Sequence, residues 1–206
     1  LGVAWLFITP LVGIVAWVFL QKTGLLKPGD VDIPYPVYVL VGTSMWGLFM
    51  SFFMAASGTL QSGQAFVMQV NYPHEALLFK QTATSLANFS IGFVMTLIIL
   101  FIFKVPPSWG ILLLPLVALP LLFLAAGVGL IVSMIGVVAV DVTNFTSISI
   151  KFLMYASPVI YSSDVASPFV RTINKWNPLT YLICSCRDIV IYGRLYDTKG
   201  YFICAA

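Results

Sequence analysis

The sequence predicts an all-α integral membrane protein, and three observations support this. Of its 206 residues, 60% are hydrophobic and only 8% are charged, whereas soluble domains average about 25% charged residues. The mean hydropathy is +1.02. The apolar runs are also continuous over about 20 residues, as a membrane helix requires, and do not alternate as a membrane strand would. The net charge of +3 indicates little about partners.

Five apolar runs are long enough to be transmembrane helices. We place them at approximately residues 1–21, 37–57, 81–103, 111–138 and 142–161. Pro115 and Pro120 are expected to kink the fourth run. The last residues, GYFICAA, read as the start of a sixth span. Because the chain begins inside a span and without Met, we expect it to be a fragment that lacks both termini.

The segment 162–199 is expected to form two short helices that dip into one membrane face. Charged residues are concentrated here, so the segment is not a span. Asp164 can cap a first helix that contains Arg171. Asn177 and Pro178 can start a second helix, with Asn at the cap and Pro at the first helical position. That second piece is apolar but too short to cross a bilayer, which is typical of re-entrant segments.

A near-miss to a phosphate-binding loop argues against ATP binding by this chain. The stretch GTLQSGQA, residues 58–65, has the glycine spacing of such a loop. However, Gln64 stands where the loop needs Lys, and Ala65 where Mg²⁺ needs Ser or Thr. We therefore expect no nucleotide, Mg²⁺ or other cofactor to be bound by this chain itself.

Other catalytic and metal chemistry is also disfavoured. The chain has one His and no pair of acidic residues inside an apolar run, so a hydrolase site is not expected. The three cysteines have no His partners at metal-ligand spacing, so we interpret them as packing residues. They are Cys184, Cys186 and Cys204.

Lys151 lies clearly inside an apolar run. An ion-coupled carrier would be expected to place several ionisable residues in its spans, so this class is disfavoured. Lys151 could line a polar vestibule. The alternative, which we favour from the sequence, is that its side chain extends to the nearer membrane interface.

Six short motifs, in order along nearly the whole chain, resemble one family. It is the permease subunits of ABC-2 type exporters for polysaccharides and polyol phosphates, such as O-antigen, capsule and teichoic acid. The motifs are Leu1-Gly2 with Trp5 and Pro10, Tyr72-Pro73, PPSW at 106–109, GVGL at 127–130, SPVIY at 157–161, and Asn177-Pro178. SPVIY is the most specific of them.

The resemblance implies a six-span permease fold, of which five spans, two re-entrant outer helices and the start of a sixth are present. It also implies that residues 58–80 are cytoplasmic and residues 162–199 lie outside. Counting Lys and Arg alone would place the two segments the other way round. One departure is Val140, where the family often has Arg before Asp141-Val142.

The resemblance further implies that this chain works with a second copy of itself and with an ATPase. Residues 1–206 would form one permease domain in the bacterial cytoplasmic (inner) membrane, paired with a second copy as a homodimer and driven by a separate ABC ATPase. Segment 58–80 would be the coupling segment, and its alternative is a plain polar turn. It is helix-permissive, with apolar side chains available to pack on a partner, and Tyr72-Pro73 ends it. The residues implied in the ATPase contact are Gln64, Phe66, Met68, Gln69, Val70, Tyr72 and Pro73.

The implied substrate is a glycan on a lipid carrier, and no nucleic acid is expected. Aromatic rings offer sugars a flat surface, and Trp46, Phe49 and Phe53 share one helical face, which Trp5 could join. Lipid-facing or packing aromatics are an equally good interpretation. Two other functions stay open: an ABC-2 exporter of lipids or drugs, and a non-transporting membrane assembly factor.

Overall fold

The computed structural model describes residues 2–24, 31–60, 74–162 and 167–206, and within them the chain forms helices and no strand. The helices are α1 (Gly2–Lys22), α2 (Tyr35–Ser57), α4 (His74–Ile102), the 3₁₀ helix η1 (Trp109–Leu113), α5 (Leu114–Gly136), α6 (Val140–Leu153), α7 (Pro168–Trp176), α8 (Pro178–Ile191) and α9 (Thr198–Ala205). The all-α membrane fold expected from the sequence is confirmed.

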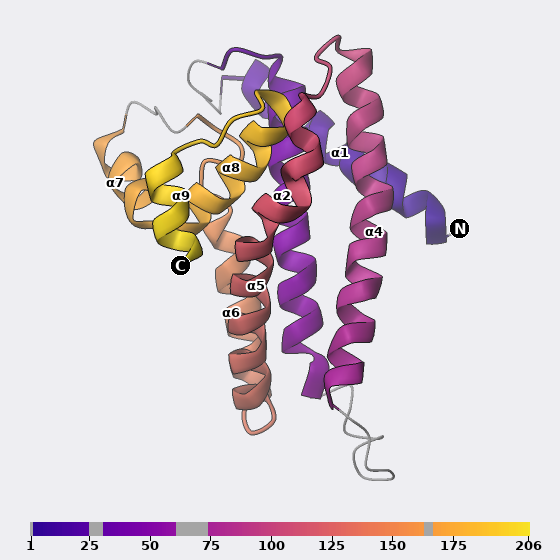
Figure 1. Cartoon of the computed structure of the whole chain (residues 1–206), viewed down its shortest axis with the longest axis vertical. Coiled ribbons are helices and arrows are strands. Elements are labelled where there is room, and N and C mark those ends of the chain that lie inside the picture. Colours follow the sequence, from indigo (N-terminus) through magenta and orange to yellow (C-terminus); the bar gives the residue numbers. More distant parts are fainter. Residues whose placement is uncertain (1, 25–30, 61–73, 163–166) are drawn as a thin grey trace.

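Three helices among the described residues are long and apolar enough to cross a membrane. They are Tyr35–Ser57, Phe79–Ile102 and Trp109–Gly136, which match the second, third and fourth expected spans closely. In Figure 1, α2, α4 and α5 run side by side along the long axis, and α6 returns beside α5. Helix α1 occupies the first expected span and crosses the others obliquely.

The fifth expected span, residues 142–161, is not one continuous helix. Helix α6 ends at Leu153, and a helix of 14 residues is about 21 Å long, which is shorter than the roughly 30 Å apolar core of a bilayer. Turns follow, with Tyr155 N bonded to Phe152 O at 3.0 Å and Val159 N to Ser157 O at 2.7 Å. Pro158 keeps the chain from resuming a helix at Ser157, because a proline disfavours helix in the residue before it.

Helix α2 is the centre of the packing. It contacts α1, α4, α5 and α8, and most of its side chains are buried. Its closest approach is to α5, at Gly129. A Cβ at Gly129 would lie 2.6 Å from the Ala56 Cβ and 2.7 Å from the Phe53 carbonyl oxygen. Only a glycine allows the two backbones to come this close.

Two short helices, α7 and α8, form within residues 162–199, as expected. The Asn177 side chain accepts a hydrogen bond from Leu179 N at 3.0 Å, and Pro178 occupies the first turn of α8. The structure adds that α8 is buried, because all its side chains except Pro178 and Tyr181 lie inside the protein. The membrane side of these helices stays a prediction.

The glycine pair in α5 provides a matched test of this packing. Replacing Gly129 with Ala should lower the free energy of unfolding by about 1–3 kcal/mol, because the new methyl group meets the α2 backbone. Gly127→Ala is the control, since a Cβ there meets nothing within 4 Å and Ala favours helix. Thermal unfolding in detergent measures both, and equal melting temperatures would contradict the close α2–α5 contact.

Candidate functional site

The aromatic residues predicted to contact a glycan lie on α2, and the structure buries them. Trp46 is 5% exposed, Phe49 2% and Phe53 0%, and the rings of Trp46 and Phe49 are 5.5 Å apart. Phe53 belongs to the core beside α5, which matches the packing interpretation. Trp46 and Phe49 each still line a cavity. The side chain of Trp5 lies outside the described residues.

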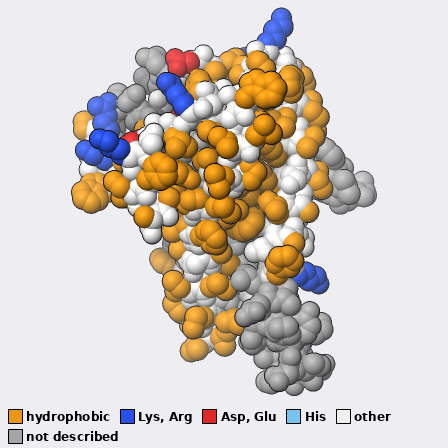
Figure 2. Space-filling view, in the orientation of Figure 1, with side chains coloured by type: hydrophobic (Ala, Val, Ile, Leu, Met, Phe, Trp, Pro, Cys, Tyr) orange, Lys and Arg blue, Asp and Glu red, His pale blue; other side chains and the backbone are white. Residues whose placement is uncertain are grey.

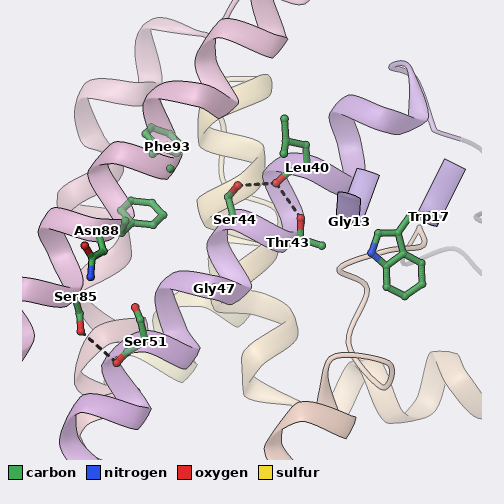
Figure 3. A pocket seen from close by; sticks show the side chains of 12 residues that line it. Gly13, Trp17, Leu40, Thr43, Ser44, Gly47, Ser51, Ser85, Asn88 and Phe93 are labelled. Atoms are coloured by element: carbon green, nitrogen blue, oxygen red, sulfur yellow. Dashed lines mark hydrogen bonds between the residues drawn. The ribbon is translucent and has the colours of Figure 1, made fainter. Parts of the chain in front are cut away.

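A groove of about 400 Å³ opens between α1, α2 and α4, and Figure 3 shows the side chains that line it. Hydroxyl, amide, aromatic and glycine residues alternate along its walls. They include Trp17 from α1, Thr43, Ser44, Gly47 and Ser51 from α2, and Ser85, Asn88, Phe89, Gly92 and Phe93 from α4. Sequence reasoning missed this groove, although small residues at spacings of three and four indicate close helix packing in membranes.

Most hydroxyl groups in the groove bond to helix carbonyls. Ser44 Oγ donates to Leu40 O at 2.7 Å, and Thr43 Oγ1 donates to Val39 O at 2.7 Å. Ser51 Oγ donates to Leu48 O at 3.0 Å. These bonds remove the cost of placing hydroxyl groups in an apolar medium. Because each oxygen can still accept a hydrogen bond, the groove offers acceptors beside the stacked rings of Phe89 and Phe93, 5.2 Å apart.

The SPVIY turn, residues 157–161, joins α2 to α8. Two tyrosines of α2 donate to its carbonyls: Tyr35 Oη to Ile160 O at 3.0 Å, and Tyr38 Oη to Tyr161 O at 2.9 Å. Asn177 Nδ2, at the cap of α8, donates to Ser157 Oγ at 2.8 Å. Two motifs that are 20 residues apart in the sequence therefore meet in one hydrogen-bonded joint.

A buried ion pair completes this joint. Arg187, in α8, is 4% exposed. Its Nε lies 2.9 Å from Asp188 Oδ1, its Nη1 donates to Pro158 O at 3.0 Å, and its guanidinium lies 4.2 Å from the ring centroid of Tyr38. Burial raises the pKa of Asp188, while the charge of Arg187 opposes that rise. The sequence signal for this cluster was an Arg-Asp pair in an otherwise apolar helix.

Exposed basic residues are concentrated at one end of the bundle. Figure 2 shows basic side chains gathered at the end that carries α7 and α9. Arg171 is exposed there, on α7. The opposite end holds the C-terminus of α2 and the N-terminus of α4. Asp164, which was predicted to cap the first short helix, lies outside the described residues, and the N-cap of α7 is Ser167 instead.

The residues predicted to contact an ATPase also lie outside the described residues, namely Gln64, Phe66, Met68, Gln69, Val70, Tyr72 and Pro73. Their flanks are well fixed. Thr59 Oγ1 donates to Gln81 Oε1 at 3.0 Å, and Leu60 N donates to Ser133 Oγ at 3.1 Å. These bonds hold residues 59 and 60, at the start of the predicted coupling segment 58–80, to α4 and α5 of the transmembrane bundle.

Comparison with known families decides the classification. Residues 1–191 match the family described as ABC-2 type transporter. The chain belongs to the ABC-2 type transporter family. This confirms the resemblance seen in the sequence. It makes the chain a membrane subunit of a transporter, and the family implies an ABC ATPase as its partner.

Curated members of the family include three similar proteins. The chain is 26% identical over 200 residues to an O-antigen export system permease protein RfbA of Klebsiella pneumoniae, which covers 95% of this chain and 74% of that protein. A second RfbA of this species is 23% identical, covering 94% and 74%. An RfbA of Myxococcus xanthus is 24% identical, covering 100% of this chain and 79% of that protein.

The ion pair in this ABC-2 chain gives a second prediction. Arg187→Met should lower the free energy of unfolding by about 3 kcal/mol or more, because it leaves the Asp188 carboxylate buried without its partner. The double variant Arg187→Met/Asp188→Leu should recover much of this loss, since no unpaired charge remains. Melting temperatures in detergent measure both. Arg194→Met, at an exposed arginine, is the control, and an equally small effect at Arg187 would contradict the joint.

Proposed function

We propose that this chain is the transmembrane subunit of an ATP-driven exporter that moves a lipid-linked polysaccharide across the bacterial cytoplasmic membrane. The observation that carries the proposal is the similarity over 94% or more of the chain to three permeases named for O-antigen export. Similarity of this extent covers nearly the whole chain, so the proposal does not rest on a single motif.

The chemistry of the groove supports a sugar polymer as the substrate. A glycan presents hydroxyl groups on its edges and C–H groups on its faces, so its path needs both hydrogen-bonding groups and flat apolar surfaces. The groove between α1, α2 and α4 combines Ser44, Ser51 and Asn88 with the rings of Trp17 and Phe89. A path for a lipid or an apolar drug would not need this row of polar side chains.

Energy for transport would come from a separate ATPase. The glycine-containing stretch at residues 58–65 lacks the lysine and the hydroxyl residue that ATP and Mg²⁺ require. ATP and Mg²⁺ would therefore be bound by the partner subunit, and this chain would supply the path and the coupling segment.

A second copy of the chain would complete the path. The outward face of α6 carries Asp141, Asn144 and Lys151, all of which are exposed in the single chain. Polar and charged groups in a transmembrane region face a bundle interior or water and not lipid tails. A homodimer that encloses this face would remove it from lipid.

Export can be tested directly in cells. Deleting the gene should reduce surface glycan at least tenfold and leave lipid-linked glycan in the cytoplasm. The wild-type chain with its partner ATPase should restore surface glycan, detected by antibody on intact cells. The same pair with the phosphate-loop lysine of the ATPase changed should not restore it, because the chain has no nucleotide site of its own. Unchanged surface glycan after deletion would refute export of this glycan.

Phe66→Ala tests the coupling segment. An apolar anchor in a partner pocket is worth about 2 kcal/mol or more of binding, so the variant should co-purify with much less ATPase and export less glycan. Insertion of the chain should not change, because Phe66 is outside every span predicted from the sequence. His74→Ala is the control and should matter less, since a lone interfacial imidazole is usually solvated. Wild-type co-purification and export by Phe66→Ala would assign the contact elsewhere.

A further inference from the structure

The outward face of α6 differs from that of its neighbour α5. Every exposed residue of α5 is apolar or glycine, including Leu116, Phe123 and Met134. The exposed face of α6 instead mixes Asn144 and Lys151 with Phe152. The α5 face suits contact with lipid tails, whereas the α6 face does not, because charged and amide groups are costly in lipid.

Lys151 lies in the last turn of α6, beside the middle of α2. It lines the same cavity as Trp46, which is the middle residue of α2 (Tyr35–Ser57). At 1.5 Å per residue, Trp46 is about 16 Å from either end of that helix. Lys151 is likewise about 16 Å along α6 from Val140. The interfacial placement favoured from the sequence stays a prediction.

The ammonium group of Lys151 also lacks a protein counter-charge. Among the described residues, Arg187 and Asp188 form an ion pair. Lys151 has no acidic partner in this part of the chain. Its surroundings are aromatic. The cavity, of about 320 Å³, is lined by Trp46, Lys151, Phe152, Met154 and Tyr155.

These aromatic rings form a continuous array beside the charge. The ring centroids of Phe152 and Tyr155 are 6.3 Å apart, and those of Tyr155 and Trp17 are 6.2 Å apart. Phe152 and Tyr155 are more than half exposed, so their faces are open to a ligand. Trp17 also lines the groove between α1, α2 and α4, so the array connects the two cavities.

We propose that Lys151, with Trp46, Phe152 and Tyr155, forms a subsite for an anionic group of the transported molecule, a phosphate or a carboxylate. The proposal rests on glycan export as the function of the chain. Aromatic faces bind the C–H faces of a sugar, while the ammonium group binds the anion, and a charge-assisted hydrogen bond is strong where water is scarce. The anion can belong to the sugar repeat or to the diphosphate of the lipid carrier.

The test compares two glycans on the same lipid carrier in cells that hold the full transporter. One polymer carries a glucuronate in each repeat, and the other carries glucose in its place. Lys151→Met removes the charge and leaves an unbranched side chain that is one atom shorter, and Lys151→Arg keeps the charge. Lys22→Met, at an exposed lysine at the end of α1, is the matched control. Surface glycan, membrane insertion, dimer content and ATPase co-purification are measured for each variant.

We expect Lys151→Met to lower export of the acidic polymer about tenfold, the value of one charge-assisted hydrogen bond, and Lys151→Arg to restore most of it. Unchanged export of the neutral polymer would assign the anion to the sugar. An equal loss for both polymers, restored by Arg, would assign it to the carrier diphosphate. Either result supports the subsite.

Three results would overturn the subsite. The first is export at the wild-type level by Lys151→Met. The second is a loss of export by Lys151→Met that Lys151→Arg does not restore. The third is a loss of dimer or of inserted protein in Lys151→Met, which would make Lys151 a structural partner of another chain. Failure of the wild-type transporter to export either polymer would instead refute glycan export itself.

Discussion

The burial of α2 on nearly all sides is the constraint on which the rest of the structure depends. A membrane helix surrounded by protein must bond its polar groups to its own backbone or to neighbouring elements, and α2 does so without a charged residue. The N-terminal half of α2 packs against the SPVIY turn at Gly42. A Cβ at Gly42 would lie 2.5 Å from the Val159 carbonyl oxygen. The C-terminal half of α2 packs against α5 at Gly129. Two glycines, one on α2 and one on α5, therefore set how closely the bundle packs.

Polar groups within the bundle are handled in three different ways. The hydroxyls of Thr43 and Ser44 bond to carbonyls of their own helix. Arg187 is neutralised by Asp188 and held by the Pro158 carbonyl. Lys151 has neither arrangement among the described residues. The hydroxyl groups and Arg187 have their partners within the protein and need no ligand. A transported anion would therefore matter at Lys151.

Sequence patterns predicted the helices well where a single local rule decides them. Continuous apolar runs predicted α2, α4 and α5, and the Asn177-Pro178 step predicted the start of α8. The end of α6 was missed because hydropathy continues through SPVIY, whereas the backbone turns there to bond with α2. The groove at Ser44 and Ser85 was missed for a related reason. It depends on which faces of two helices meet, and no local pattern determines that.

The SPVIY turn connects the short helices α7 and α8 to α2. Its carbonyls are bonded by Tyr35 and Tyr38 of α2 and by Arg187 of α8, and its Ser157 hydroxyl is bonded by Asn177. Tyr161 in turn donates to Asn174 of α7 at 3.2 Å. Helix α8 therefore cannot shift relative to α2 without carrying the turn along or breaking buried hydrogen bonds, each of which is costly to leave unmade. In a transporter whose two ends must respond to each other, such a joint makes α8 and α2 move as one unit.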